Sequence, residues 1–168
     1  MTAIVLVGLM GSGKSTVGRL VAEATGRELV DVDVAITART GKTVRQLWEE
    51  GGEAAYRSLE REEVLTTLGR SDVVLAAPGG VILDPTVRDA LGDAFVAWLR
   101  ARPDTLAARV RAGDHRPLLG ENPEDDFATM DAERADLYAA VADITLDADR
   151  NSPDALAAEL VERLPDAP

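Results

Sequence analysis

Apolar and polar residues form two alternating patterns along the chain. Short apolar runs lie at residues 3–7, 28–33, 72–77, 94–99 and 143–146, and such runs are typical of buried strands. Between them, an apolar residue every three or four positions predicts helices at 17–24, 34–39, 44–50, 53–68, 103–111, 125–141 and 152–164. The pair Asp84-Pro85 marks the start of one more helix.

Strands that alternate with helices predict an α/β fold. Parallel neighbours need a crossover connection, so we expect a three-layer α-β-α arrangement around a central five-stranded parallel sheet. The 168 residues fit one domain, 1–168. Ligands of such sheets bind beyond the carboxyl ends of the strands. The polar segment 112–124 interrupts the helical pattern, and we expect it to form a mobile lid.

A glycine-rich loop joins the first predicted strand to the first helix. The segment Gly8-Leu-Met-Gly-Ser-Gly-Lys-Ser-Thr16 fits the pattern G-x-x-x-x-G-K-[ST], which between a strand and a helix indicates phosphate binding. Its backbone N–H groups can surround an anion at the positive end of the helix. Lys14 would supply charge to the β- and γ-phosphates, and Ser15 a hydroxyl ligand for Mg²⁺. An ordinary glycine-rich turn is the weaker alternative.

Composition and charge narrow the possible partners. The content of 46% hydrophobic and 29% charged residues is that of a globular protein, and no run approaches the ~18 apolar residues that span a membrane. A net charge of −12 argues against nucleic-acid binding, which needs clustered lysine and arginine. The absence of cysteine excludes disulfides and thiolate metal sites. The first strand begins too early for a signal peptide, so we expect a cytoplasmic protein.

Two acidic residues end the second predicted strand. Asp31 and Asp33 lie two apart on a segment expected to be extended, so both should point to one side, beside the phosphate loop. One could position Mg²⁺ and the other could accept the proton of an attacking hydroxyl. The alternative is that they cap the following helix.

Further basic residues are candidates for binding anions. Arg57 and Glu60 lie three apart on a predicted helix and form either a surface salt bridge or a substrate clamp. Arg116, in the expected lid, could close over phosphates and stabilise transition-state charge. His115 beside it is the only histidine and is expected to be a solvent-exposed lid residue.

Six segments together resemble the shikimate kinases, a family within the nucleoside-monophosphate-kinase-like group of P-loop proteins. With the family pattern in parentheses, they are Gly8–Thr16 (Walker A), Asp31-Val-Asp33 (D-x-D), Gly52–Glu60 (G-E-x-x-F-R-x-x-E), Pro78-Gly79-Gly80 (three glycines), Arg116-Pro-Leu-Leu119 (R-P-L-L) and Arg134–Tyr138 (R-x-P-L-Y). The resemblance runs over nearly the whole chain, and it implies a P-loop NTPase sheet with strand order 2-3-1-4-5.

On the nucleotide side, the resemblance implies one site for ATP and Mg²⁺. The ATP phosphates would lie on Gly11, Ser12, Gly13, Lys14, Ser15 and Thr16. Ser15 would bind Mg²⁺ directly, and Asp31 would hold it through water. Arg109 and Pro153 would enclose the adenine, and Arg116 would reach the phosphates with the lid.

On the acceptor side, the resemblance implies a shikimate site in the segment 33–61 and beyond it. Asp33 would bind the ring hydroxyls and act as or near the catalytic base, with Lys14 and Arg116 as the other catalytic residues. Arg57 and Arg134 would bind the carboxylate, with Glu60 orienting Arg57. Gly79 and Gly80 would offer backbone N–H groups.

Three departures from the family pattern matter for the predicted substrate contacts. Pro78 replaces the first of three glycines and has no N–H to donate. Asp136 replaces a proline and could compete for Arg134. Asn151 stands where some members have an arginine near adenine, a role that Arg150 could take.

The sequence therefore predicts a monomeric kinase that uses Mg²⁺ and ATP. It would transfer the γ-phosphate to the 3-hydroxyl of shikimate, giving shikimate 3-phosphate and ADP in aromatic amino-acid (chorismate) biosynthesis. The alternatives are a P-loop kinase for another small acceptor, such as gluconate or a nucleoside monophosphate, and a nucleotide-dependent switch without turnover. The switch would leave Asp33, Arg57 and Arg134 without a role.

Overall fold

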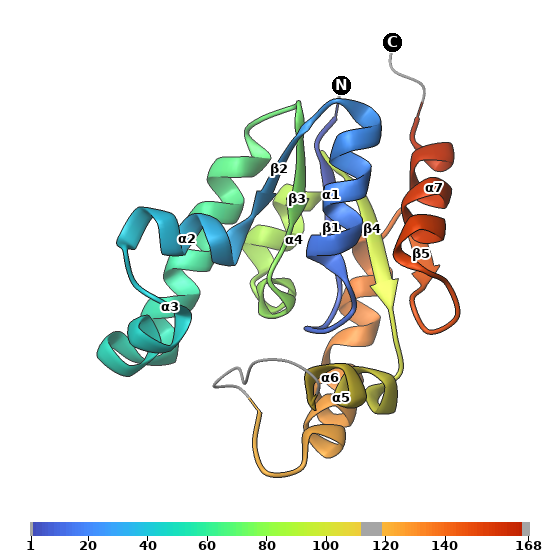
Figure 1. Cartoon of the computed structure of the whole chain (residues 1–168). Coiled ribbons are helices and arrows are strands. Elements are labelled where there is room, and N and C mark those ends of the chain that lie inside the picture. Colours follow the sequence, from blue (N-terminus) through green and yellow to red (C-terminus); the bar gives the residue numbers. More distant parts are fainter. Residues whose placement is uncertain (1, 112–118, 166–168) are drawn as a thin grey trace.

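A five-stranded parallel sheet forms the centre of the computed structural model, which describes residues 2–111 and 119–165 (Figure 1). The strands are β1 (Ile4–Val7), β2 (Glu28–Asp31), β3 (Val73–Ala76), β4 (Phe95–Arg100) and β5 (Ile144–Asp147). Their order across the sheet is β2-β3-β1-β4-β5. The predicted strand order and parallel direction are confirmed.

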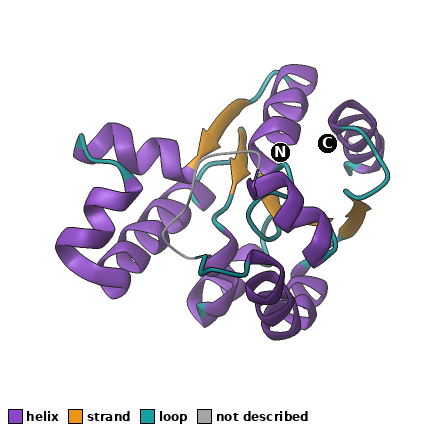
Figure 2. Cartoon of the chain, turned by 60° about the horizontal axis from the view of Figure 1, so that its bottom comes forward, coloured by secondary structure: helices purple, strands orange, loops and turns teal. Residues whose placement is uncertain are grey.

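Helices cover both faces of the sheet (Figures 1 and 2). They are α1 (Lys14–Thr25), α2 (Val32–Thr40), α3 (Val44–Leu68), η1 (Gly79–Leu83, a 3₁₀ helix), α4 (Pro85–Leu91), α5 (Pro103–Arg111), α6 (Pro123–Val141) and α7 (Pro153–Arg163). Helix α1 packs against α7, whereas α3 packs against α4 and η1, and α6 against η1 and α5. No helix of the described ranges 2–111 and 119–165 is long and apolar enough to cross a membrane.

The hydrophobic core is built around the central strands, which are buried on both faces. Every residue of β1 and of β3 is buried, as expected for parallel strands with helices on both faces. Ile4 of β1 is in register with Val74 of β3 and with Phe95 of β4. The carboxyl ends of β1, β2 and β3 therefore lie at one edge, and the loops that follow them are neighbours.

The second strand is shorter than predicted. It ends at Asp31, and α2 begins at Val32, because the Asp31 carboxylate accepts the backbone N–H groups of Asp33 and Val34 and caps the helix. Asp33 thus lies in the first turn of α2. The prediction that Asp31 and Asp33 share an extended segment is wrong. The alternative that both cap the next helix is confirmed for Asp31 and wrong for Asp33, which lies inside the first turn.

Helix α3 contains the break predicted at Gly51-Gly52. Gly52 has φ 74° and ψ −177°, a conformation outside the helical region that other residues rarely adopt. Thr43 and Gln46 form a reciprocal capping box at its start. The two predicted helices, 44–50 and 53–68, therefore form one kinked helix.

The segment 112–124 is described only in part. Residues 112–118, which include His115 and Arg116, lie outside the described residues, so the predicted lid is not tested. Residues 119–122 have no helix or strand, and α6 begins at Pro123 rather than at residue 125. The acidic first turn of α6, Glu124 to Asp126, is favourable at a helix N-terminus.

Candidate active site

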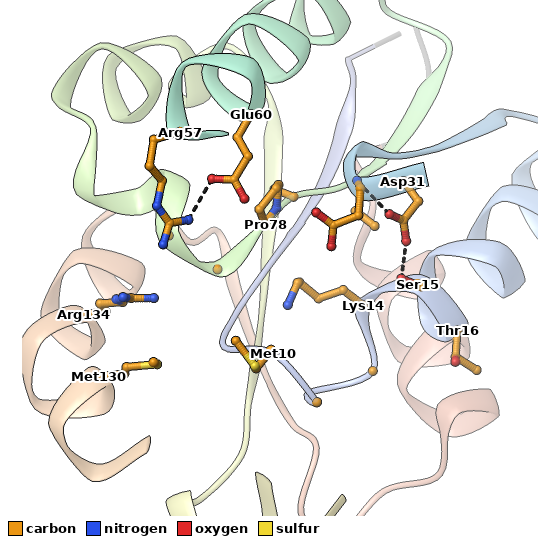
Figure 3. Close-up of a pocket in the computed structure, with 17 residues that line it drawn as sticks. Met10, Lys14, Ser15, Thr16, Asp31, Arg57, Glu60, Pro78, Met130 and Arg134 are labelled. Carbon is orange, nitrogen blue, oxygen red and sulfur yellow. Dashed lines mark hydrogen bonds and ion pairs between the residues drawn. The ribbon is translucent and has the colours of Figure 1, made fainter. Parts of the chain in front are cut away.

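A cavity of about 280 Å³ lies at the carboxyl ends of β1, β2 and β3 (Figure 3). Its lining comes from the loop after β1 and the start of α1, the end of β2 and the start of α2, helix α3, the end of β3 with the loop and the start of η1 that follow it, and α6. The lining residues are Met10, Gly11, Gly13, Lys14, Ser15, Thr16, Asp31, Asp33, Arg57, Glu60, Ala76, Ala77, Pro78, Gly79, Gly80, Met130 and Arg134. Segments far apart in the sequence are thus brought to one site.

The phosphate loop has the conformation expected of its glycines. Gly13 is the N-cap of α1 and has φ 98°, in the left-handed region. The Lys14 ammonium donates to the carbonyls of Gly8 and Leu9, at 2.8 and 3.0 Å, and so lies over the loop. A phosphate at the N-terminus of α1 would meet this charge and the helix dipole together.

The two residues predicted to bind Mg²⁺ contact each other. The Ser15 hydroxyl donates to one carboxylate oxygen of Asp31, and the other oxygen caps α2 (Figure 3). A hydroxyl and a carboxylate are hard oxygen ligands that suit Mg²⁺. Residues 2–111 and 119–165 contain no cluster of three or more acidic or histidine side chains that could hold a metal. The chemistry therefore fits an ion that nucleotide phosphates and water complete, as Mg²⁺ usually is.

Asp33 reaches the cavity from the first turn of α2. Its Oδ1 accepts a hydrogen bond from the Tyr56 hydroxyl of α3, at 2.7 Å. The Tyr56 ring is buried and packs at a tilt against Trp48, with ring centroids 5.9 Å apart. The contact of Tyr56 with the candidate base is a site feature that the sequence did not indicate.

Arg57 and Glu60 are not a surface salt bridge. Nη1 of Arg57 donates to Oε2 of Glu60 at 2.7 Å, and the Glu60 side chain is only 4% exposed. Both residues line the cavity, and the guanidinium also lies 6.0 Å from the ring centroid of Trp48. Of the two alternatives, the geometry favours the substrate clamp.

Arg134 faces Arg57 across the same end of the cavity (Figure 3). It is buried, yet its Nε has no hydrogen-bond partner among the described residues, and its ion pair with Glu133 is long, at 3.5 Å. Asp136 is exposed. Residues two positions apart on a helix point in different directions, so Asp136 does not share the buried face of Arg134. The predicted competition from Asp136 is therefore wrong, and a buried cation is left facing the cavity.

The loop after β3 is held by a tyrosine from α6. The Tyr138 hydroxyl donates to the Gly79 carbonyl at 2.6 Å, and its ring stacks on Trp98. Burial raises the pKa of Tyr138, so this hydroxyl keeps its proton. Pro78 precedes the 3₁₀ turn with φ −60°, and its carbonyl accepts the N–H of Val81. The proline is accommodated without loss of the turn.

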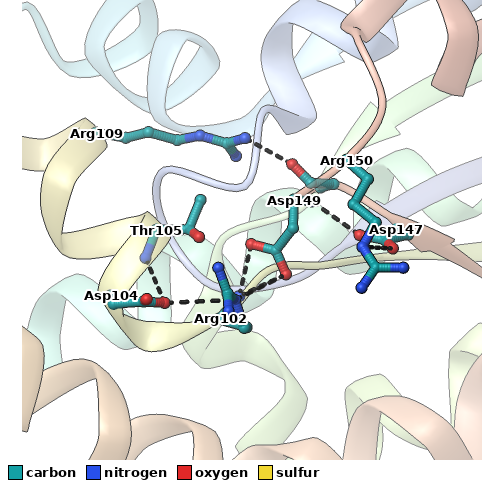
Figure 4. Close-up of polar contacts among 8 residues, drawn as sticks. Arg102, Asp104, Thr105, Arg109, Asp147, Asp149 and Arg150 are labelled. Carbon is teal, nitrogen blue, oxygen red and sulfur yellow. Dashed lines mark hydrogen bonds and ion pairs between the residues drawn. The ribbon is translucent and has the colours of Figure 1, made fainter.

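The residues predicted to enclose adenine lie outside this cavity, near β5. Arg109 donates to the carbonyls of Gly11 and Ala148, at 3.1 and 2.6 Å, and so connects the phosphate loop to the loop after β5 (Figure 4). Pro153 is the first residue of α7, behind the Ser152 cap. The Arg150 side chain is highly exposed, and its Nε lies 3.9 Å from a carboxylate oxygen of Asp147. Its role near adenine in place of Asn151 stays a prediction.

Asp149 connects the loop after β5 to the start of α5 by hydrogen bonds (Figure 4). Its two carboxylate oxygens accept the Arg102 backbone N–H, at 3.1 and 3.2 Å. Partial burial raises the pKa of Asp149, but hydrogen bonds from the Thr105 side chain and the Arg102 backbone outweigh it and leave the pKa below its usual value. The sequence does not single out this residue, since one acid among many in a loop is not distinctive.

Most predicted site residues meet in the cavity. The exceptions are Ser12, which is buried beneath the loop with no hydroxyl partner in the described structure, Arg109 and Pro153 near β5, and Arg116 outside the described residues. Met10 and Met130 also line the cavity and were not predicted. The position of Met130 could have been found from its spacing, one helical turn before Arg134.

Comparison with known proteins gives one consistent result. A family model described as shikimate kinase matches residues 10–165. Over 165 residues the chain is 42% identical to the shikimate kinase of Symbiobacterium thermophilum, covering 96% of this chain and 95% of that protein. The shikimate kinase of Mycobacterium avium is 38% identical over 162 residues, with coverage of 96% and 92%. A solved structure of shikimate kinase from Acinetobacter baumannii in complex with shikimate has a TM-score of 0.92 at 34% identity, covering 96% of this chain and 92% of that one.

Proposed function

Because the chain belongs to the shikimate kinase family, we propose that it transfers the γ-phosphoryl group of ATP to the 3-hydroxyl of shikimate. The products are shikimate 3-phosphate and ADP, and the reaction would serve aromatic amino-acid biosynthesis. The observation that carries this proposal is the pair of arginines, Arg57 and Arg134, opposite a phosphate loop in one cavity that also contains Asp33. Such a site suits an acceptor with a carboxylate at one end and a hydroxyl at the other.

Each predicted site residue keeps its role as part of this proposal. Gly11 to Thr16 bind the ATP phosphates, and Lys14 neutralises the charge that develops on the transferring group. Arg109 and Pro153 bind the adenine side. Arg116 closes onto the phosphates; this role rests on its resemblance to the family's R-P-L-L segment.

In the acceptor site, Arg57 and Arg134 bind the carboxylate of shikimate, and Glu60 holds Arg57 in place. Gly79 and Gly80 contribute backbone N–H groups, and Asp33 accepts hydrogen bonds from the ring hydroxyls. The segment 33–61 is accordingly the main acceptor-binding segment.

The reaction then proceeds mainly by positioning and electrostatics. The 3-hydroxyl oxygen attacks the γ-phosphorus in line, the bond from that phosphorus to the β–γ bridging oxygen breaks, and the hydroxyl proton passes to Asp33. Ser15, and Asp31 through water, would hold Mg²⁺, which when bound with ATP offsets the negative charge of the phosphate oxygens.

An acceptor panel tests the proposal. Coupled ADP release would be measured with Mg²⁺ and ATP, adding shikimate, gluconate, AMP or no acceptor, and the phosphorylated position would be identified by ³¹P–¹H correlation NMR. Release with shikimate alone, with phosphate at the 3-position, is the expected result. Faster release with gluconate or AMP would refute the substrate assignment, and binding of ATP without any release would favour the switch.

Two broader predictions belong to the same proposal. We expect a cytoplasmic monomer whose residues 1–168 form one domain. Sedimentation equilibrium at micromolar concentration would test the monomer, for which the expected mass is 17.8 kDa. A mass twice this value would refute it.

A further inference from the structure

A tyrosine hydroxyl contacts the carboxylate that we propose as the base. Tyr56 donates to Oδ1 of Asp33 at 2.7 Å, from a ring that is only 2% exposed and that packs against Trp48. The two residues lie on different helices, Tyr56 on α3 and Asp33 on α2. No role described so far uses this hydroxyl.

We infer that Tyr56 is a positioning residue, which fixes the Asp33 carboxylate for reaction with the acceptor hydroxyl; this inference rests on the proposed function. The last torsion of an aspartate is broad, so its carboxylate turns easily unless another group holds it. A short hydrogen bond from a ring that packing holds in place removes this freedom. A base oriented before the substrate arrives loses less entropy at the transition state.

The surroundings of Asp33 support this assignment. Its backbone N–H donates to Oδ1 of Asp31 at 3.1 Å, so its main chain is fixed from the metal-binding side. The Tyr56 hydroxyl, which belongs to α3, holds the side chain. Main chain and carboxylate are thus held by different elements, and only the second contact belongs to Tyr56.

Helix α3 would therefore position both ends of the acceptor. Arg57, the next residue, lines the cavity and pairs with Glu60, whereas Tyr56 points to Asp33. Because both groups belong to one helical turn, the distance between the carboxylate clamp and the base is set by one rigid segment.

The chain differs at this position from the motif that it otherwise resembles. The family pattern G-E-x-x-F-R-x-x-E has phenylalanine where this chain has Tyr56. The substitution Tyr56→Phe therefore keeps a ring that the fold accommodates and removes one oxygen atom. It is the conservative variant for testing the hydroxyl.

Steady-state kinetics of Tyr56→Phe give the first test. Hydrogen bonds to charged groups are strong enough that loss of this one should lower kcat/KM for shikimate on the order of tenfold. We expect both a higher KM and a lower kcat, since the proposed role of Asp33 includes binding the ring hydroxyls. The KM for ATP should stay within about twofold, because Tyr56 does not itself line the cavity that contains the phosphate loop. Unchanged kcat/KM in Tyr56→Phe, with an active parent enzyme, would overturn the inference. An inactive parent would instead refute the proposed function.

A double-mutant cycle shows whether the hydroxyl acts through Asp33. Shikimate affinity would be measured by titration calorimetry for the parent, Tyr56→Phe, Asp33→Ala and the double variant. We expect Tyr56→Phe to weaken binding in the parent and to have no further effect once Asp33 is alanine. An equal effect in both backgrounds would mean that Tyr56 acts only on the fold.

Tyr138→Phe is the matched control for this cycle. It removes the same atom from an equally buried ring, whose hydroxyl donates to Gly79 instead of Asp33. Its effect on shikimate affinity should be the same with and without the Asp33 carboxylate. Coupling to Asp33 as strong as that of Tyr56 would show that the cycle reports general loss of packing, and would overturn the inference.

Discussion

Replacement of Arg57 by alanine is expected to have two separable effects, one on stability and one on shikimate binding. The guanidinium pairs with Glu60 at 2.7 Å and also lines the cavity. Glu60 is 4% exposed, so the variant would leave a buried carboxylate without its arginine. The same substitution would remove a donor to the substrate carboxylate.

The stability effect follows from the burial of the pair. Removing one member of a buried ion pair costs about 3–5 kcal/mol, and we take the lower value because the Arg57 side chain is 24% exposed. For a chain of this size, 1 kcal/mol changes the melting temperature by about 2–4 °C. We therefore expect Tm to fall by about 6–12 °C, measured by differential scanning calorimetry.

The binding effect is measured by kinetics at a temperature where the variant is folded. Loss of hydrogen bonds to a charged group costs about 1.5–3 kcal/mol, which corresponds to a rise of about 10–150-fold in the KM for shikimate. The KM for ATP should change by less than about twofold. Equal increases in both KM values would refute the reasoning and make Arg57 a scaffold residue.

A double variant separates the two effects. In Arg57→Ala/Glu60→Gln the buried group is neutral, so most of the lost melting temperature should return. The KM for shikimate should remain high, since the arginine is still absent. Recovery of the KM together with Tm would mean that the binding defect came from instability.

Three further predictions concern other parts of the site. Lys14→Met should lower kcat at least about 100-fold, because it removes charge at the transferring phosphate; near-normal kcat would exclude the phosphate-loop role. Gly80→Ala should raise the KM for shikimate several-fold, because a Cβ there would overlap the Arg57 guanidinium; an unchanged KM would show that Arg57 can move without cost. At pH values above about 3.9, the ordinary pKa of an unfolded aspartate, Asp149→Asn should lower the free energy of unfolding in urea by a constant amount. As pH falls through the lower folded pKa of Asp149, this difference should vanish, since protonation removes the same charge; a difference that does not shrink as the pH falls would refute it.

The fold could be predicted because its signals are local and repeated. Runs such as residues 72–77 and the amphipathic stretch 53–68 have the right length and period, and parallel strands leave few possible topologies. The loop Gly8–Thr16 and the pair Arg57 and Glu60 were found from their spacing. The structure brings all of these to one edge of the sheet.

The errors and omissions concern contacts between distant residues. The segment 28–33 allows Asp31 either to continue the strand or to cap the next helix, and only the structure shows that it caps α2 and ends the strand two residues early. The exposed position of Asp136 depends on which face of α6 is buried. The contact of Tyr56 with Asp33 spans 23 positions of sequence, and it arises from the packing of α2 on α3.

The hydrogen bond from Tyr138 to Gly79 has a consequence for how the loop after β3 can vary. In a trans peptide the carbonyl and the following N–H point in opposite directions, so holding the Gly79 carbonyl also sets the direction of the Gly80 N–H. The orientation of this loop is therefore set by Tyr138 of α6, which lies 59 residues after Gly79 in the chain. As long as Tyr138 is retained, the peptide between Gly79 and Gly80 keeps its direction when residue 78 changes. A proline can therefore replace a glycine at position 78.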